Sequence, residues 1–545
     1  MKHTGTGHRD RWVLAIDLGT TRLKVGIVSF TGSVAWTTGA ELNTRFTNDG
    51  GAEQDATEWW RLVRDAARAA VLSGTVRPDE IVAVSATGQW ASTVPVAEDG
   101  TAVGPCILWM DTRGGRHARR RFGGPVSGYS PRALATWIRK SGGAPSTSGA
   151  DPIGHMLYLE MNRPAVARDA RWYLEPVDYL SMRLTGTAAA SPASMTAAWL
   201  TDNRHVGRVA YDADLIRMAG ITGSKLPPLR PTGSVVGTVR DDVAADLGLG
   251  PGVAVVAGTP DLHSAAAGTG TLESFQCHMA ISTTSWISCP VPFKKTNPIR
   301  QVASVPGILP DQYLVANNHE TAGACLQWLR DQVIAPDDVL SCLTRPGFAE
   351  LIELAATASP GCGGVLFTPW LAGERSPIDD RNARAGFHNL SLETSRAVIV
   401  RAVLEGVACN NRWLHQAVEH FVKRRLEPIR LFGGGAQSDL WCQIHADVMD
   451  RTIERLADPI HANLRGAAIL AGMTLGDIGR SAAGALAQID AIFQPDPSNR
   501  ALYDRLYAEF PKLYKSQKAM FRRLNRGPAS RVRDPAPSSA SDLHA

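Results

Sequence analysis

The chain contains 545 residues, 44% of them hydrophobic and 20% charged, and its formal net charge at pH 7 is +5. A single hydrophobic core does not keep growing at this length, so two large domains are expected. The composition is that of an ordinary globular protein, and no apolar run of about 18 residues predicts a membrane span. Residues 1–11 are polar and lack the apolar segment of a secretion signal.

Basic residues cluster at Arg116–Arg121 and at Lys512–Arg533. With so small a net charge, these clusters favour a solvated helix face and a solvated tail over a nucleic-acid-binding surface. The eight cysteines have no CxxC spacing, which argues against zinc and favours reduced thiols. We therefore expect a cytoplasmic protein that binds neither nucleic acid nor a membrane.

The first predicted strand is the apolar run 13–17, which ends in Asp17 and a small turn of Gly19, Thr20 and Thr21. A second apolar run follows directly. A glycine admits close backbone approach, amides and hydroxyls donate to phosphate oxygens, and a carboxylate can hold a metal. The pattern predicts a phosphate site. The alternative for Asp17 is a strand-end residue that caps the next turn.

Alternating strands and helices follow this turn. A helix is predicted from about Asp55, which has capping-box spacing to Glu58. A strand over 81–86 then leads into a small-residue loop that contains Gln89 and Trp90. Strands that end in such loops, with helices between them, indicate an α/β architecture.

An apolar strand over 253–257 leads into Asp261, which begins a helix rich in small residues. The position alone allows two interpretations of this side chain. It is a base in a cleft, or it is a helix N-cap, where aspartate is favoured. We place the junction of the two domains just after Gly270.

Beyond Gly270 the same order of elements restarts. The strands over 276–281 and 286–290 enclose a hydroxyl-rich turn, which predicts a second half-site for one polyphosphate. The other elements expected here are a helix from about Glu320, a strand over 364–368, a long helix over 392–421, a strand over 429–432 and a helix from Leu464. The two halves resemble one architectural unit used twice. The composition after Arg526 predicts a disordered tail over 527–545.

Taken together, several motifs resemble the FGGY family of carbohydrate kinases, and its xylulokinase-like members most closely. They occur in the family's order over nearly the whole chain, and they are Ile16–Thr21, Gly88–Gln89, Trp109–Arg113, Asp178–Tyr179 with Leu184–Gly186, Gly258–Asp261 with Gly268–Gly270, Gly373–Pro377, Arg401–Gly406, Gly433–Ala436 and Gly466–Ala468. The resemblance implies an α/β fold of two actin-like (ribonuclease H-like) domains, each a mixed sheet flanked by helices, with the active site in the interdomain cleft. The implied domains are a sugar-binding domain over 12–270 and a nucleotide-binding domain over 271–526.

The resemblance also implies ATP and Mg²⁺ as cofactors. Phosphoryl transfer needs phosphate cradles, a metal and a base on the accepting hydroxyl. The implied base is Asp261, and Asp17 is the implied ligand of Mg²⁺, held through water. Lys24 or Arg22 is expected to supply a nearby cation.

The residues expected to bind the nucleotide come from both halves. They are Gly19, Thr20, Thr21, Thr283, Thr284, Ser285, Gly434, Gly435, Ala436 and Gln437. Thr283 stands where the family usually has glycine, and its Cβ is expected to narrow the approach of the phosphate. The alternative interpretation of the glycine-rich loop is a tight strand-to-helix turn.

The residues expected to bind the sugar are Gln89, Trp90, Asp111 and Asp261. Xylulokinases usually carry Met-His after the Gly-Gln, whereas this chain has Trp90 and Ala91, so a hydrogen-bonding imidazole is absent. Two interpretations are open for Trp90: its ring stacks on the sugar, or it belongs to the core. Two interpretations are open for Asp111, Trp109 and Arg113. They line the sugar pocket, or Asp111 and Arg113 form a structural ion pair beside the tryptophan.

We expect ATP-dependent phosphorylation of a hydroxyl of a small sugar or polyol, foremost a ketopentose such as xylulose. The alternatives are a kinase for ribulose, glycerol, erythritol or a deoxysugar, and a non-catalytic nucleotide-binding sugar sensor. The absence of GxGxxG after the first strand and of GxxxxGK[ST] disfavours a Rossmann oxidoreductase and a P-loop enzyme. The oligomeric state stays open, a homodimer included.

Overall fold

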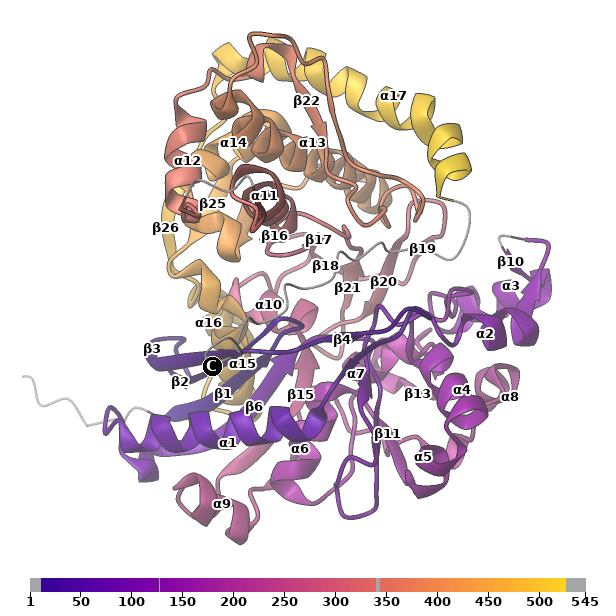
Figure 1. Ribbon diagram of the computed structural model, residues 1–545. Coiled ribbons are helices and arrows are strands. Elements are labelled where there is room, and N and C mark those ends of the chain that lie inside the picture. The colour runs from indigo at the N-terminus through magenta and orange to yellow at the C-terminus, as the bar shows by residue number, and fades with distance from the viewer. Residues whose placement is uncertain (1–10, 127, 340–343, 526–545) are drawn as a thin grey trace, which may run out of the picture.

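The computed structural model describes residues 11–126, 128–339 and 344–525. The first half of the chain forms the lower lobe of Figure 1, and most of the second half forms the upper lobe. The tail expected over 527–545 lies outside the described residues. Of the helices in the described ranges, none has the length and apolar character needed to cross a membrane.

The lower lobe is built on a mixed six-stranded sheet. In spatial order its strands are β14 (Val235–Thr238), β15 (Ala254–Pro260), β6 (Ile81–Gly88), β1 (Trp12–Leu18), β2 (Arg22–Ser29) and β3 (Val34–Glu41). Strands β1, β6 and β15 are parallel neighbours, and the other three pair antiparallel. The strands predicted in this half are confirmed, and β15 continues up to the residue before Asp261.

Helices bury both faces of this sheet. Leu14 and Ile16 of β1 lie in a core shared with α1 (Ala56–Leu72) and α6 (Pro176–Thr185). Val13 and Ala15 point to the opposite face and pack with α15 (Ala462–Thr474), a helix from the second half of the chain. A strand covered on both faces reads as a continuous apolar run, as β1 does.

The helix predicted from Asp55 is α1. The Asp55 carboxylate accepts a hydrogen bond from the Thr57 amide, so it caps the helix start. Trp59 and Val63 lie four residues apart on the buried face of α1, as the helical spacing predicts.

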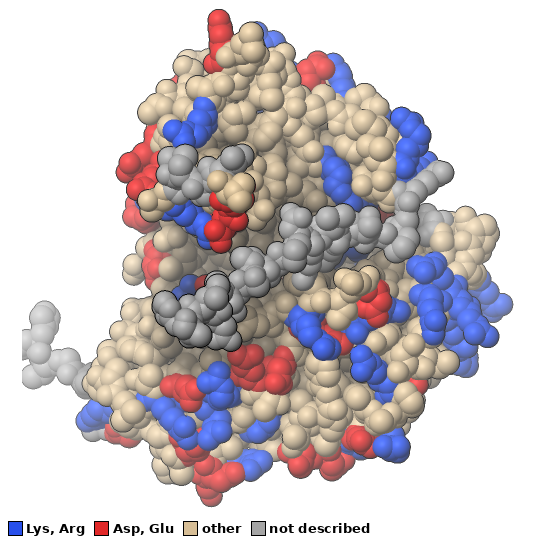
Figure 2. Space-filling view, viewed as in Figure 1, with Lys and Arg blue, Asp and Glu red and all other residues tan. Residues whose placement is uncertain are grey.

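Between β6 and β14 the lower lobe carries an insertion of short elements. They are β7 (Val94–Val96), β8 (Cys106–Ile107), α2 (Gly115–Phe122), α3 (Pro131–Lys140), α4 (Pro152–Asn162), α5 (Pro164–Asp169), β11 (Trp172–Leu174), α7 (Pro192–Met195) and α8 (Ala213–Ala219). Lys and Arg side chains gather over α2 and α3 in Figure 2. On α2, Arg116, Arg119 and Arg120 are exposed while Ala118 and Phe122 are buried, which confirms the solvated helix face.

The upper lobe repeats the strand arrangement of the lower one. Its sheet runs in the order β17 (Ser285–Ser288), β16 (Cys277–Ile281), β24 (Ile429–Phe432), β25 (Ile453–Leu456) and β26 (Ile489–Phe493). In the lower sheet, β1 pairs antiparallel with β2, and on its other side β6 and then β15 follow in the parallel direction. In the upper sheet, β16 pairs antiparallel with β17, and β24 and then β25 follow in the parallel direction. The expectation of one unit used twice is confirmed at the level of topology.

Smaller elements complete the upper lobe. A second sheet contains β18 (Pro290–Val291), β21 (Tyr313–Ala316), β20 (Val302–Pro306) and β19 (Thr296–Asn297). The other elements are α11 (Gly323–Leu329), α12 (Phe348–Ala356), β22 (Leu366–Thr368), β23 (Gly386–His388), α13 (Arg396–Val422), α14 (Asp439–Met449) and α17 (Arg500–Leu524). The helix expected from Glu320 therefore begins at Gly323.

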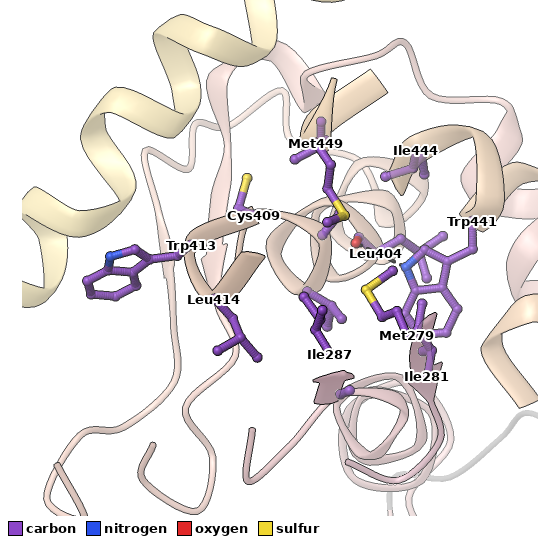
Figure 3. Packing of buried hydrophobic residues seen from close by; sticks show 14 of the residues in the cluster. Met279, Ile281, Ile287, Leu404, Cys409, Trp413, Leu414, Trp441, Ile444 and Met449 are labelled. Atoms are coloured by element: carbon purple, nitrogen blue, oxygen red, sulfur yellow. Dashed lines mark hydrogen bonds between the residues drawn. The ribbon is translucent and has the colours of Figure 1, made fainter. Parts of the chain in front are cut away.

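Side chains from β16 and β17 pack beneath α13 and α14 to form the core of the upper lobe, as Figure 3 shows for Met279, Ile281 and Ile287. The Trp441 indole N–H donates to the carbonyl oxygen of Leu404 over 3.1 Å, which ties α14 to α13. This core fixes the end of β16, from which the second hydroxyl-rich turn projects.

The two lobes meet where α10 (Asp261–Gly268) crosses α15. A Cβ on Gly466 would lie 1.9 Å from the Ser264 carbonyl oxygen, and a Cβ on Gly268 would lie 1.9 Å from the Ala462 carbonyl oxygen. Both helices therefore approach at backbone distance, which only glycine permits. Because Asp261 begins α10, this crossing also fixes the position of Asp261.

We expect Gly466→Ala to destabilise the fold by about 1–3 kcal/mol, because the steric cost of overpacking outweighs the gain in helix propensity. Chemical denaturation measures the free energy of unfolding. Gly479→Ala is the matched control, since no atom lies within 4 Å of a Cβ at that position. Equal stability of the two variants would contradict the close crossing.

Candidate active site

Asp17 and Asp261 project from the same edge of the lower sheet. In the parallel register of β1, β6 and β15, Leu18 lies opposite Gly88 and Gly88 lies opposite Pro260. Asp17 is the residue before Leu18, and Asp261 is the residue after Pro260. The sheet therefore brings together two carboxylates that are far apart in the sequence.

Asp17 is nearly buried and is paired with a lysine. Lys24 Nζ lies 3.0 Å from Asp17 Oδ2 and 3.3 Å from the carbonyl oxygen of Ile460. Ile460 follows Pro459, whose carbonyl accepts from the Gly433 amide over 2.9 Å. The cation expected beside the first turn is thus Lys24, and it also connects that turn to the glycine-rich loop of the upper lobe.

Asp261 is half-buried at the first position of α10, where its Oδ1 accepts from the Leu262 amide over 2.7 Å. Burial raises the pKa of the Asp261 carboxyl to about 7; the Leu262 amide lowers it, and the negative charge of Asp17 raises it further. A carboxyl group with such a pKa can take up and release a proton near neutral pH.

The turn after β1 contacts the sugar side of the lower lobe. Thr21 is exposed, while Gly19 and Thr20 are half-buried. The Trp109 indole N–H donates to Thr20 Oγ1 over 3.1 Å, and the Trp109 amide donates to Ser92 Oγ over 3.1 Å. Trp109 therefore connects the turn expected to hold phosphate with the loop after β6.

Gln54 is a site residue that the motifs did not indicate. Its Nε2 donates to the Thr20 carbonyl over 2.7 Å, and its Oε1 accepts from Gln89 Nε2 over 3.3 Å and from the Trp59 indole over 3.1 Å. One buried amide thus contacts both the predicted phosphate turn and the predicted sugar-binding loop of the lower lobe. The signal in the sequence was a glutamine directly before the helix cap Asp55.

The loop after β6 presents Gln89 and Trp90. Gln89 is 4% exposed, and its Oε1 has no hydrogen-bond partner among the described residues. The half-buried Trp90 donates its indole N–H to the Ser194 carbonyl over 2.7 Å, and its ring meets His263 edge-on at 5.5 Å. The polar atom of Trp90 is therefore occupied, and its ring packs against a buried cluster that contains Leu262 and Ala265 of α10.

Glu175 holds the loop after β6 in place through a hydrogen bond, a role that the sequence did not suggest. Its Oε2 accepts from the Ser92 amide over 3.2 Å, and burial raises the pKa of this carboxyl well above the ordinary value. Ser92 in turn holds the Trp109 amide. Glu175 therefore positions Trp90 and Trp109 together.

Asp111 is completely buried and fully hydrogen-bonded. Its carboxylate accepts from the Ala52 amide over 2.9 Å and pairs with Arg113 over 2.7 Å. Arg113 also lies 2.6 Å from Glu53. Of the two interpretations, this geometry favours the structural ion pair, and it does not support a direct contact between Asp111 and a sugar.

The second hydroxyl-rich turn joins β16 to β17 in the upper lobe. Thr283 is exposed, Thr284 is half-buried, and Thr283 does not have a positive φ, so the turn accepts a threonine without backbone strain. Ser285 differs, since its hydroxyl is buried and donates to the Ala280 carbonyl over 2.7 Å. Thr283 and Thr284 are available to a ligand, whereas Ser285 supports the hairpin.

The glycine-rich loop follows β24 as a short 3₁₀ turn over Gly434–Gln437. Gly433 has φ 94°, and a Cβ there would lie 2.5 Å from the Ile281 carbonyl oxygen, so this position requires glycine. A Cβ on Gly434 would meet no atom within 4 Å. Gly434 and Gln437 are exposed, and Ala436 is buried.

Comparison with known proteins agrees with this arrangement. Residues 12–268 match the sequence model described as FGGY family of carbohydrate kinases, N-terminal domain, and residues 276–475 match that of the C-terminal domain. A xylulose kinase of Staphylococcus epidermidis is 29% identical over 519 residues, which cover 93% of this chain and 97% of that protein.

Two solved structures share the fold over almost their full length. The xylulose kinase from Rhodospirillum rubrum aligns with a TM-score of 0.77 and 26% identity, and the alignment covers 94% of this chain and 100% of that chain. The gluconate kinase from Lactobacillus acidophilus aligns with a TM-score of 0.80 and 22% identity, covering 95% and 100%. The two-domain actin-like arrangement of this chain is therefore shared with sugar kinases.

We predict that Asp261→Asn stabilises the protein increasingly as pH rises. The pKa of Asp261 in the fold, about 7, exceeds the ordinary value of 3.8, so folding disfavours the ionised form. This cost is absent below the ordinary pKa, grows through the window between the two values and is complete above about pH 7. An asparagine does not ionise, so the variant does not carry this cost in folding free energy.

The measurement is the free energy of unfolding of wild type and Asp261→Asn at about pH 5 and about pH 8. The exposed Asp65, mutated to asparagine, is the control. A stability difference that does not grow with pH would show that Asp261 titrates as an ordinary surface carboxyl.

Proposed function

The chain belongs to the FGGY family of carbohydrate kinases, and we propose that it transfers the terminal phosphoryl group of ATP to a hydroxyl of a ketopentose such as xylulose. The products are the sugar phosphate and ADP. The observation that carries the proposal is the parallel register of β1, β6 and β15, which brings Asp17 and Asp261 to the same end of the sheet. The similarity to a xylulose kinase over nearly the whole chain supports a ketopentose as the acceptor.

In this proposal Asp261 accepts the proton of the attacking hydroxyl. Its Oδ1 is held by the Leu262 amide, and its Oδ2, which has no hydrogen bond to any residue that the structure describes, would face the acceptor. At neutral pH a substantial fraction of a group with a pKa of about 7 is ionised, so the base is present without an activating partner. The Asp17 charge contributes to this pKa, which couples the state of the base to the phosphate side of the site.

The residues at Asp17 fit Mg²⁺. Asp17 Oδ2 pairs with Lys24, and among the described residues its Oδ1 has no hydrogen bond that would compete with a metal or its water. The described ranges hold no group of three or more His, Cys, Asp or Glu side chains suited to a metal. Mg²⁺ does not need one, since it binds through one or two carboxylates, waters and substrate phosphates. When bound, it would neutralise charge on the phosphates.

The nucleotide is assigned to both turns and to the glycine-rich loop. The accessible members of the predicted set are Gly19, Thr20, Thr21, Thr283, Thr284, Gly434, Gly435 and Gln437. Lys24 would place a positive charge beside the transferred phosphoryl group, because it already contacts Asp17 and the segment that supports Gly433. Ser285 and Ala436 would act by holding the turn and the loop in place.

A second candidate is a kinase for another sugar or polyol, and Trp90 favours it. The indole N–H of Trp90 is occupied by Ser194, so the ring meets the acceptor only through its apolar face. Such a surface suits a C–H-rich part of a sugar. Gln89, with an unpaired Oε1, remains to bind a hydroxyl.

A coupled ADP assay over a panel of xylulose, ribulose, glycerol, erythritol and a deoxysugar tests the proposal. We expect one acceptor to give the highest kcat/KM and Asp261→Asn to lower kcat by about 10²- to 10⁴-fold, because the variant keeps the shape but loses the base. Asp65→Asn on α1 is the control. Near-normal turnover of Asp261→Asn would remove the assigned base, and ATP binding without ADP formation from any acceptor would favour a sensor.

A further inference from the structure

One loop of the upper lobe is held rigidly and carries an arginine to the lower lobe. Its anchor is Glu374, which is completely buried. Glu374 accepts hydrogen bonds from the Glu320 amide over 3.1 Å and from Asn410 Nδ2 over 2.6 Å, and it lies 3.0 Å from His319. These contacts hold the start of the loop.

The other end of the loop is also fixed. The Glu374 amide donates to the Asp380 carbonyl over 3.0 Å, and the Asp380 amide donates back to the Glu374 carbonyl over 2.8 Å. The Tyr514 hydroxyl of α17 donates to Asp380 Oδ2 over 2.9 Å. The residue after Glu374 therefore has a defined position, although its side chain is long.

That residue is Arg375, and its guanidinium reaches the opposite lobe. It lies 5.8 Å from the centre of the Trp109 ring, while its Nε donates to Glu320 Oε1 over 2.9 Å. The Arg375 side chain is 32% exposed, so part of it remains open to a ligand. Trp109 in turn contacts Thr20, so Arg375 faces the lower-lobe side of the site from above.

The charges around Arg375 do not leave it an unpaired cation. Glu320 pairs with Arg375 directly, and the positive charge of Arg375 acts electrostatically on the carboxyl groups of Asp151 and Asp379. Arg381 adds the second cation of this group. The Glu320–Arg375 ion pair is the contact that an incoming carboxylate would have to displace in order to pair with Arg375.

We propose that Arg375 lines the acceptor pocket from the upper lobe and that its pairing with Glu320 suits the pocket to an uncharged acceptor. This inference rests on the proposed kinase function and deepens it. The remaining N–H groups of Arg375 donate to hydroxyl or carbonyl oxygens of the bound acceptor, beside the ring of Trp109. An aldonate is rejected because its carboxylate must compete with Glu320 for Arg375.

The test measures steady-state kinetics of wild type, Arg375→Gln and Glu320→Gln with the best neutral acceptor and with gluconate. We expect wild type to prefer the neutral acceptor. Arg375→Gln should raise the KM for that acceptor about 10- to 100-fold while the KM for ATP changes less than about twofold, because charged hydrogen bonds to the acceptor are lost. Glu320→Gln should raise the gluconate-to-sugar ratio of kcat/KM about tenfold, because Arg375 becomes available to a carboxylate.

The matched control is Arg384→Gln, because within the described residues the Arg384 side chain donates hydrogen bonds only to the carbonyls of Arg381 and Ala383 in its own loop. Thermal unfolding of each variant establishes that the fold is kept. Titration calorimetry with the neutral acceptor gives a second readout that does not depend on turnover, and Arg375→Gln should weaken the acceptor Kd by a similar factor.

The outcomes separate this inference from the proposed function. If wild type turns over a neutral acceptor and Arg375→Gln behaves like Arg384→Gln, only the role of Arg375 is overturned. The same holds if Arg375→Gln raises both KM values equally. If wild type prefers gluconate, the preference for an uncharged acceptor and the ketopentose acceptor of the proposed function are both overturned. If wild type phosphorylates no acceptor, the proposed function is overturned, and the inference with it.

Discussion

The parallel pairing of β1, β6 and β15 is the constraint on which the rest of the site depends. Each of these strands runs toward the same edge of the sheet, so the residues at their ends, Asp17, Gln89 and Asp261, are carried into one region. A register error of one residue would turn these side chains to the other face of the sheet. The side chains of β1 pack against α1 on one face and against α15 on the other, so such a slip would disrupt two sets of close contacts.

Contacts between the lobes extend this constraint to the nucleotide side. The crossing of α10 and α15 at Gly268 and Gly466 fixes the helix that begins with Asp261. Lys24 joins Asp17 to Ile460, beside the segment that supports the glycine-rich loop. A carbohydrate kinase must bring an acceptor and a nucleotide together in a defined geometry, because phosphoryl transfer is achieved mainly by positioning and charge stabilisation. These few contacts place the two binding surfaces next to each other.

Much of the fold could be predicted from the sequence, because it depends on local patterns. The strands over 13–17 and 429–432 are largely apolar runs followed by turns of small residues. Asp17 and Asp261 were identified because each stands at or just after the end of such a strand. The sequence did not indicate Gln54 or Glu175, whose roles depend on partners distant in the chain. The direction of side chains could not be predicted either: Asp111 and Ser285, which were predicted to bind the sugar and the nucleotide, make their hydrogen bonds inward. The packing of α15 on the sheet of the other lobe is likewise a property of the tertiary structure.

Because Asp17 and Asp261 lie at the same end of the sheet, the negative charge of Asp17 raises the pKa of Asp261. An NMR titration of ¹³C-labelled aspartate carboxyl groups measures the pKa of Asp261 in wild type and in Asp17→Asn. We expect a pKa of about 7 in wild type, caused first by burial and then by Asp17, and a lower value in the variant. An Asp261 that titrates near 3.8 in wild type, or whose pKa is unchanged by Asp17→Asn, would contradict it.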